Sequence, residues 1–147
     1  MGERYDLARF VAAQDAGGTY ECALAELRAG RKTGHWMWFV FPQIAGLGYS
    51  ETSRRYAIAS RAEAAAYLQH VLLGPRLIEC TQIVDATRAR SATEIFGPVD
   101  AKKLQSCMTL FLRAAPGEPL FGSVLDRYFA GVPDRHTDQL LGRPGGP

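Results

Sequence analysis

Helix-start signals constrain the fold of this chain more than any other feature of its sequence. Ser60-Arg61-Ala62-Glu63 and Ser91-Ala92-Thr93-Glu94 both match the capping box. In that motif the serine side chain accepts a hydrogen bond from the backbone N–H three residues on, and the glutamate reaches back to the N–H of the serine. Each match therefore predicts that a helix begins just after the serine.

Apolar side chains at three- and four-residue spacing predict further amphipathic helices. The longest such segment begins at Asp100, which is predicted to cap it, and it stops at Pro116-Gly117. Shorter segments end at Gly17-Gly18 and Gly30, and another opens at Gly74-Pro75, where proline suits a first helical turn. One more amphipathic helix is predicted from about residue 119 to residue 130. The sequence predicts a mainly α fold.

The chain shows no internal repeat, no low-complexity linker and no sign of a second domain. Its 147 residues are enough for one domain to bury a core without metals or disulfides. We therefore expect residues 1–142 to form a single compact multi-helix domain with few or no strands. The last residues, 143–147, are rich in glycine and proline and are expected to be a flexible tail.

Charge and cysteine content exclude several classes of partner. A formal net charge of +2 is far below the basic balance of most proteins that bind nucleic-acid backbones, so nucleic-acid binding is not expected. The three cysteines are scattered, which is typical of free thiols in a reducing compartment. No signal peptide or membrane-length apolar run occurs, so we expect a cytoplasmic protein without a membrane partner. Nucleotide, hydrolase and zinc motifs are missing, and we expect no cofactor and no metal.

Basic residues run directly into an aromatic block between Gly30 and Gln43. Arg31 and Lys32 follow a helix-ending glycine and are candidates for binding an anion, with a solvated basic turn as the alternative. His35 is a candidate for proton transfer, and the alternative is a histidine that only hydrogen-bonds a loop carbonyl. Trp36 and Trp38 would share one side of a strand but would lie about 200° apart on a helix, so they are either a stacking platform or core. Residues 35–41 fit either structure.

A second candidate strip lies on the helix that begins near Asp100. Asp100, Lys103 and Ser106 are three residues apart and share one face of a helix. The helix N-terminus favours anions, and Lys103 adds a positive charge there. If the strip faces a cleft, Asp100 is a candidate general base, and Lys103 and Ser106 are candidate ligand contacts. If the strip faces water, Asp100 is only a helix cap.

Two blocks, His35-Trp36-Met37-Trp38 and Ser106-Cys107-Met108-Thr109-Leu110-Phe111, resemble signatures of a widespread bacterial family of unknown function. The family is number 1810 in its naming series and is often labelled calpastatin. The resemblance extends over nearly the whole chain and implies a mainly α-helical domain, which favours helix over strand in residues 35–41. It implies no activity, and no motif in the sequence supports the protease inhibitor that the label implies.

A more remote similarity concerns only the order of the elements. An aromatic-polar block, a Glu-Ala helix and an Asp-x-x-Lys helix follow one another in an order similar to that of the NADAR superfamily. Those small helical N-glycosidases act on nucleotide or ADP-ribose derivatives. Likeness at the level of the fold does not by itself assign chemistry.

These features support two hypotheses of different classes. The first is a small-molecule hydrolase acting on a nucleotide-like or phosphorylated ligand. In this hypothesis His35 or Asp100 transfers protons, and Arg31, Lys32, Trp36, Trp38, Lys103 and Ser106 bind the ligand. The second is a non-catalytic binding or protein-interaction module whose aromatic block is mostly core. The first hypothesis requires His35, Asp100 and Lys103 to converge on one cavity beside a tryptophan.

Overall fold

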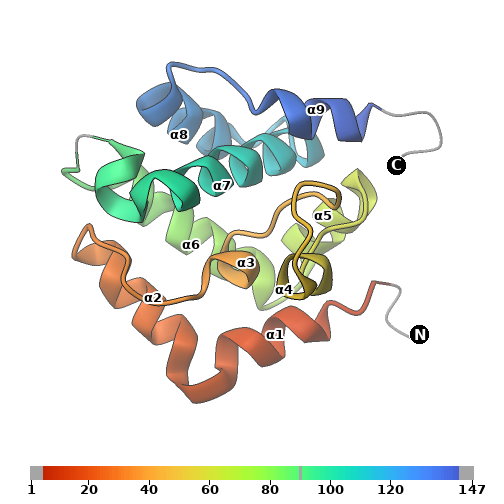
Figure 1. Ribbon diagram of the computed structural model, residues 1–147, viewed down its shortest axis with the longest axis horizontal. Coiled ribbons are helices and arrows are strands. Elements are labelled where there is room, and N and C mark those ends of the chain that lie inside the picture. Colours follow the sequence, from red (N-terminus) through yellow and green to blue (C-terminus); the bar gives the residue numbers. More distant parts are fainter. Residues whose placement is uncertain (1–4, 90, 143–147) are drawn as a thin grey trace.

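The computed structural model describes residues 5–89 and 91–142, which form helices joined by loops (Figure 1). In chain order these are α1 (Ala8–Asp15), the 3₁₀ turn η1 (Ala16–Gly18), α2 (Thr19–Arg28), α3 (Met37–Val40), α4 (Glu51–Arg55), α5 (Arg61–Gln69), α6 (Leu73–Ala86), α7 (Ala92–Ala114), α8 (Pro119–Phe129) and α9 (Arg135–Leu141). Within the described ranges there is no strand beyond one isolated bridge between Ile44 and Ile58. The predicted mainly α single domain is confirmed, and the expected tail, residues 143–147, lies outside the described residues.

Both capping boxes begin helices as the sequence predicts. The Ser60 and Ser91 side chains accept hydrogen bonds from the backbone N–H groups of Glu63 and Glu94, at 3.0 and 3.1 Å. The segment expected to begin at Asp100 joins the element that begins after Ser91, because α7 is broken at Gly97 and resumes at Pro98. Asp100 therefore lies in the first turn after the break and is not its cap.

Helix α7 is the central element, and the other helices pack around it. Figure 1 shows α8 and α9 on one side of α7 and the pair α1 and α2 on the other. Its direct packing partners are α5, α8 and α9, while α6 packs between α2, α5 and α8. The sequence dictates this position, because Cys107, Met108, Leu110 and Phe111 in the C-terminal half of α7 are apolar, and they are buried together with Thr109, whose hydroxyl donates to the Gln105 carbonyl. A helix that is apolar on all sides must be covered on all sides.

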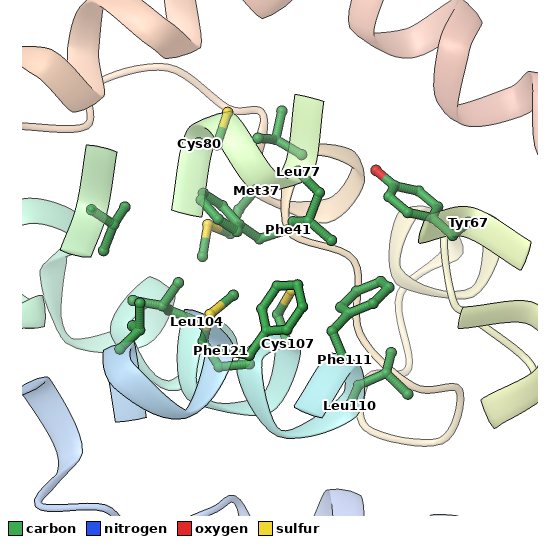
Figure 2. Packing of buried hydrophobic residues seen from close by; sticks show 14 of the residues in the cluster. Met37, Phe41, Tyr67, Leu77, Cys80, Leu104, Cys107, Leu110, Phe111 and Phe121 are labelled. Atoms are coloured by element: carbon green, nitrogen blue, oxygen red, sulfur yellow. The ribbon is translucent and has the colours of Figure 1, made fainter. Parts of the chain in front are cut away.

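The core takes buried side chains from every α-helix except α4, and also from the loop after α3. Figure 2 shows some of them facing one another: Met37 and Phe41 from the α3 segment, Tyr67 from α5, Leu77 and Cys80 from α6, Leu104, Cys107, Leu110 and Phe111 from α7, and Phe121 from α8. Aromatic rings join the layers, since Phe111 lies 5.5 Å from the ring of Tyr67 and 5.8 Å from that of Phe121. Both cysteines are buried, and burial raises the pKa of their thiols, that of Cys80 to about 12. They are small core residues and not nucleophiles.

One partly buried arginine joins the N-terminal helix to the loop between α4 and α5. The Arg9 guanidinium donates to Glu63 at 3.0 Å and to the backbone carbonyls of Arg55 and Ala57 at 2.8 Å. It also donates to the carbonyls of Tyr5 and Asp6. All five N–H donors of the side chain are thereby used. Because Arg55 and Ala57 adjoin Ile58, Arg9 also fixes the base of the loop that follows α3.

We expect Arg9→Lys to lower the free energy of unfolding by about 2 kcal/mol, although the charge is kept. A lysine ammonium has fewer donors and lacks the planar fork, so several backbone carbonyls lose their partner. Urea denaturation followed by circular dichroism measures the change. Arg61→Lys is the matched control, because Arg61 is exposed on the first turn of α5, and it should change the free energy of unfolding by less than about 0.5 kcal/mol. Equal stability of the two variants would contradict a structural role for Arg9.

Candidate functional site

A cavity of about 370 Å³ lies where α7, the loop after α3 and the start of α9 meet. We call it the Trp38 cavity. Its lining residues are Trp38, Gln43, Leu47 and Gly48 from α3 and the following loop, Pro98, Val99, Lys102, Lys103 and Ser106 from α7, and Asp134 and His136 from the start of α9. The volume is in the range of sites that hold small organic ligands. The lining combines an indole with ammonium groups and hydrogen-bonding side chains.

Backbone pairing and close packing hold the loop wall of the cavity in place. Ile58 N donates to Gln43 O, and Ala45 N donates to Ile58 O, both at 2.8 Å, so the base of the loop is closed. At Gly48 a Cβ atom would lie only 2.7 Å from Ser53 Oγ. This glycine therefore lets the loop pack directly on α4. The result is a fixed wall that presents Gln43 and Gly48 to the cavity.

A kink at Gly97 sets the direction of the α7 wall. Gly97 has φ 80° and ψ 164°, a conformation that glycine adopts without strain, and Pro98 follows it. The regular part of α7 therefore restarts at Pro98, with its first-turn N–H groups near the cavity. Lys102, Lys103 and Ser106 follow one turn later, and their spacing places Lys103 and Ser106 on one face. The positive end of the helix dipole and the two ammonium groups reinforce one another.

Asp100 holds two lysines, Lys32 and Lys103, in fixed positions. Its carboxylate contacts Lys32 Nζ at 2.8 Å and Lys103 Nζ at 3.1 Å. Lys103 Nζ also lies 4.0 Å from the ring centroid of Trp38, which is a cation–π contact. The Lys32 side chain is only 8% exposed. The group of three charges keeps a net charge of +1, and Lys103 is the member that reaches the cavity.

The pKa of Asp100 reflects this arrangement. Burial by itself would raise the pKa of the carboxyl, but the hydrogen bonds and positive charges of Lys32 and Lys103 outweigh it, and the pKa lies below its ordinary value. A carboxylate with a lowered pKa is a weak proton acceptor. Its geometry suits the positioning of lysines better than general-base catalysis.

Hydroxyl groups connect α7 to the start of α9 on the other wall of the cavity. Ser106 Oγ and Thr137 Oγ1 are 2.8 Å apart, and the Thr137 hydroxyl donates to Asp134 Oδ2 at 2.6 Å. Asp134 N donates to Thr109 Oγ1 at 2.8 Å. Ser106, Thr109 and Thr137 are all buried. These bonds fix Asp134 against α7 although it lies in a loop.

Trp36 belongs to the scaffold that supports the site. It is 1% exposed, and its Nε1 donates to Glu26 Oε1 at 2.9 Å. The same oxygen accepts from Thr33 N and Gly34 N, both at 2.8 Å. Burial would raise the pKa of Glu26, but these three donors outweigh it and lower the pKa. One carboxylate thus shapes the whole turn between α2 and α3.

The two remaining candidates from the basic turn lie elsewhere. His35 is exposed and is not part of the lining of the Trp38 cavity. Arg31 lines a different hollow of about 770 Å³ between the ends of α2 and α6, together with Arg28 and Arg88. The C-terminal ends of α2 and α6 border that hollow, and Arg127 donates to the carbonyls of Asp85 and Thr87 at the α6 end. The structure therefore brings together Trp38, Lys103 and Ser106, with Lys32 and Asp100 adjoining, and it leaves Arg31, His35 and Trp36 outside.

Comparison with known proteins agrees with this architecture. A family model described as "Protein of unknown function (DUF1810)" matches residues 4–141. The chain belongs to family DUF1810. The crystal structure of the conserved hypothetical protein Rv1873 from Mycobacterium tuberculosis has a TM-score of 0.93 to this DUF1810 chain at 54% sequence identity, with 97% of this chain and 100% of the other covered. No curated protein matches.

Sequence reasoning missed part of the DUF1810 cavity. Lys102 adjoins Lys103 in the predicted strip, and attention to both neighbours of Lys103 would have found it. Asp134 and His136 reach the cavity only through the packing of α9 on α7, and no local pattern marks them.

Among residues 5–89 and 91–142 no group of three or more histidine, cysteine, aspartate or glutamate side chains is placed to hold a metal ion. None of the helices in these ranges has both the length and the apolar character required to cross a membrane.

Proposed function

We propose that this DUF1810 protein binds a small anionic, nucleotide-like ligand in the Trp38 cavity. The observation that carries the proposal is the convergence of an indole and two ammonium groups, Trp38, Lys102 and Lys103, on one cavity of about 370 Å³. Lysine ammonium groups bind phosphate as compact positive charges, and an indole offers a flat apolar surface to a ring.

In this proposal the predicted residues have distinct roles. Lys103 contacts the anionic group of the ligand, and Lys102 adds a second charge at the exposed side of the cavity. Trp38 contacts the ring. Lys32 and Asp100 position Lys103, because the carboxylate bridges both ammonium groups. The turn with Trp36 is support, and no ligand contact is proposed for His35 or Arg31.

Binding can be measured by isothermal titration calorimetry with the four ribonucleoside 5′-monophosphates and ribose 5-phosphate. We expect at least one of them to bind, and a ligand at 100 times its Kd should raise the free energy of unfolding by about 2.7 kcal/mol. The variant Lys102→Gln/Lys103→Gln should weaken binding by roughly tenfold or more, because a hydrogen bond to a charged group contributes about 1.5–3 kcal/mol. Added salt should weaken binding to the unmodified chain more than to the variant.

Arg61→Gln is the matched control, since it removes a positive charge from an exposed site on α5. It should leave the affinity unchanged. No binding across the five ligands, or equal binding by the double variant, would contradict the proposal. Chromatography of the bound ligand after incubation separates the two kinds of function: cleavage products assign a hydrolase, for which Asp134 and His136 are the titratable side chains beside the lysines, and an intact ligand assigns a binding module.

A further inference from the structure

The chain of hydroxyl groups behind the Trp38 cavity has a defined proton order. Thr137 Oγ1 donates to Asp134 Oδ2 at 2.6 Å, and Thr137 N donates to the same oxygen at 2.9 Å. A hydroxyl group has one proton, so the Thr137 proton is committed to Asp134. The contact of 2.8 Å between Ser106 and Thr137 must therefore be made by the Ser106 proton. The order of donation is Ser106 to Thr137 to Asp134.

This order decides what Ser106 can offer a ligand. With its proton committed to Thr137, the Ser106 oxygen has only lone pairs left and acts as an acceptor. Asp134 is a second acceptor in the same cavity lining, and both of its hydrogen bonds from Thr137 reach Oδ2. Within residues 5–89 and 91–142 the structure gives Oδ1 no hydrogen-bond donor. Ser106 and Asp134 thus present acceptors to the cavity, while Lys102 and Lys103 present donors.

We infer that the ligand carries sugar hydroxyl groups that donate to Ser106 and Asp134, so that the cavity selects ribonucleotides over analogues without those hydroxyls. This inference rests on the proposed function and deepens it. A cationic amine would also donate hydrogen bonds and would be attracted by Asp134, but the two ammonium groups of Lys102 and Lys103 in the same cavity oppose it. A neutral hydroxyl has no such penalty.

The energetic basis is the cost of covering an acceptor without giving it a donor. Ser106 is 2% exposed and already paired with Thr137, whereas Asp134 is half-buried. A ligand that fills the cavity without a donor removes water from the Asp134 carboxylate and gives nothing in return. Sites built around a hydroxyl group therefore reject analogues that lack it more strongly than apolar pockets reject a missing methylene.

The test compares each ribonucleoside 5′-monophosphate with its 2′,3′-dideoxy counterpart by isothermal titration calorimetry. We expect the unmodified chain to bind the ribonucleotide at least tenfold more tightly. Ser106→Ala should lower this ratio several-fold by weakening the ribonucleotide alone, while Asp134 remains as the second acceptor. Thr137→Val should also reduce it, because Asp134 loses the hydroxyl that fixes it and the Ser106 hydroxyl is no longer held in one orientation, and Thr137→Ser should restore it.

Each outcome separates the inference from the proposed function. Equal affinity for the paired ligands in the unmodified chain would overturn the inference and leave anion binding intact. A preference that is undiminished in Ser106→Ala would also overturn it. Failure of every ribonucleotide and dideoxynucleotide to bind would overturn both. Circular dichroism of each variant confirms that the helices have formed, so that a loss of preference is not a loss of fold.

Discussion

Replacing Gly74 with alanine should lower the free energy of unfolding by about 3 kcal/mol and the Tm by about 10 °C. Gly74 lies in the first turn of α6, and a Cβ atom there would stand 2.0 Å from the backbone oxygen of Leu68 and 2.9 Å from its carbonyl carbon. A backbone carbonyl cannot rotate away as a flexible side chain can. The alanine would force α5 and α6 apart, and differential scanning calorimetry measures the loss.

Gly122→Ala is the matched control for that experiment. Gly122 is also a helical glycine, in α8, but the nearest atom to its Cβ position is Leu112 Cδ1 at an ordinary 3.9 Å. Alanine at this position should raise the free energy of unfolding by up to about 1 kcal/mol, because glycine is the poorer helix former. Stabilisation of both variants would contradict the close approach of α5 and α6 at Gly74.

Glu26→Ala should lower the free energy of unfolding by about 3 kcal/mol, an effect as large as that at Gly74. The substitution leaves Thr33 N, Gly34 N and Trp36 Nε1 without the oxygen that accepts from all of them. Hydrogen bonds to a carboxylate are stronger than those between neutral groups, although water recovers part of the loss in an open turn. Urea denaturation followed by circular dichroism measures the change.

The stabilisation by Glu26 should depend on pH in a defined direction. Folding lowers the pKa of this carboxyl from about 4.5. The stabilisation is therefore complete above the unfolded pKa and is lost as the pH falls through the folded one. The difference in stability between the unmodified chain and Glu26→Gln should be constant near neutral pH and should shrink below about pH 4.5. The control Glu21→Ala removes an exposed carboxylate from the same helix and should cost at most about 1 kcal/mol; a pH-independent difference at Glu26 would contradict this account.

The helices were predictable where local chemistry decides them. The serine caps at Ser60 and Ser91 act within four residues, and both were correct. Gly74-Pro75 was correctly placed at the opening of a helix, but sequence could not reveal why glycine is required there. The reason is that the backbone of Leu68 in α5 lies against Gly74, and this contact is a tertiary feature.

The site was predictable only in part for the same reason. Three-residue spacing brought Lys103 and Ser106 to one face, and the structure places both in the Trp38 cavity. Helical geometry also separates Trp36 from Trp38, so that one indole is buried and the other lines the cavity. The contact of Asp100 with Lys32 spans two distant segments of the chain, and the approach of α9 that brings His136 depends on packing. No local pattern encodes either.

The different surroundings of Trp36 and Trp38 make them natural optical reporters. They are the two tryptophans of the sequence. Trp36 is sealed in the core beside a carboxylate, so its emission follows the integrity of the turn that Glu26 holds. Trp38 is half-buried and lies under the Lys103 ammonium, so its emission and its accessibility to a soluble quencher follow whatever enters the cavity. A phenylalanine at either position would leave one reporter, so that loop order could be followed in one variant and cavity occupancy in the other without a label.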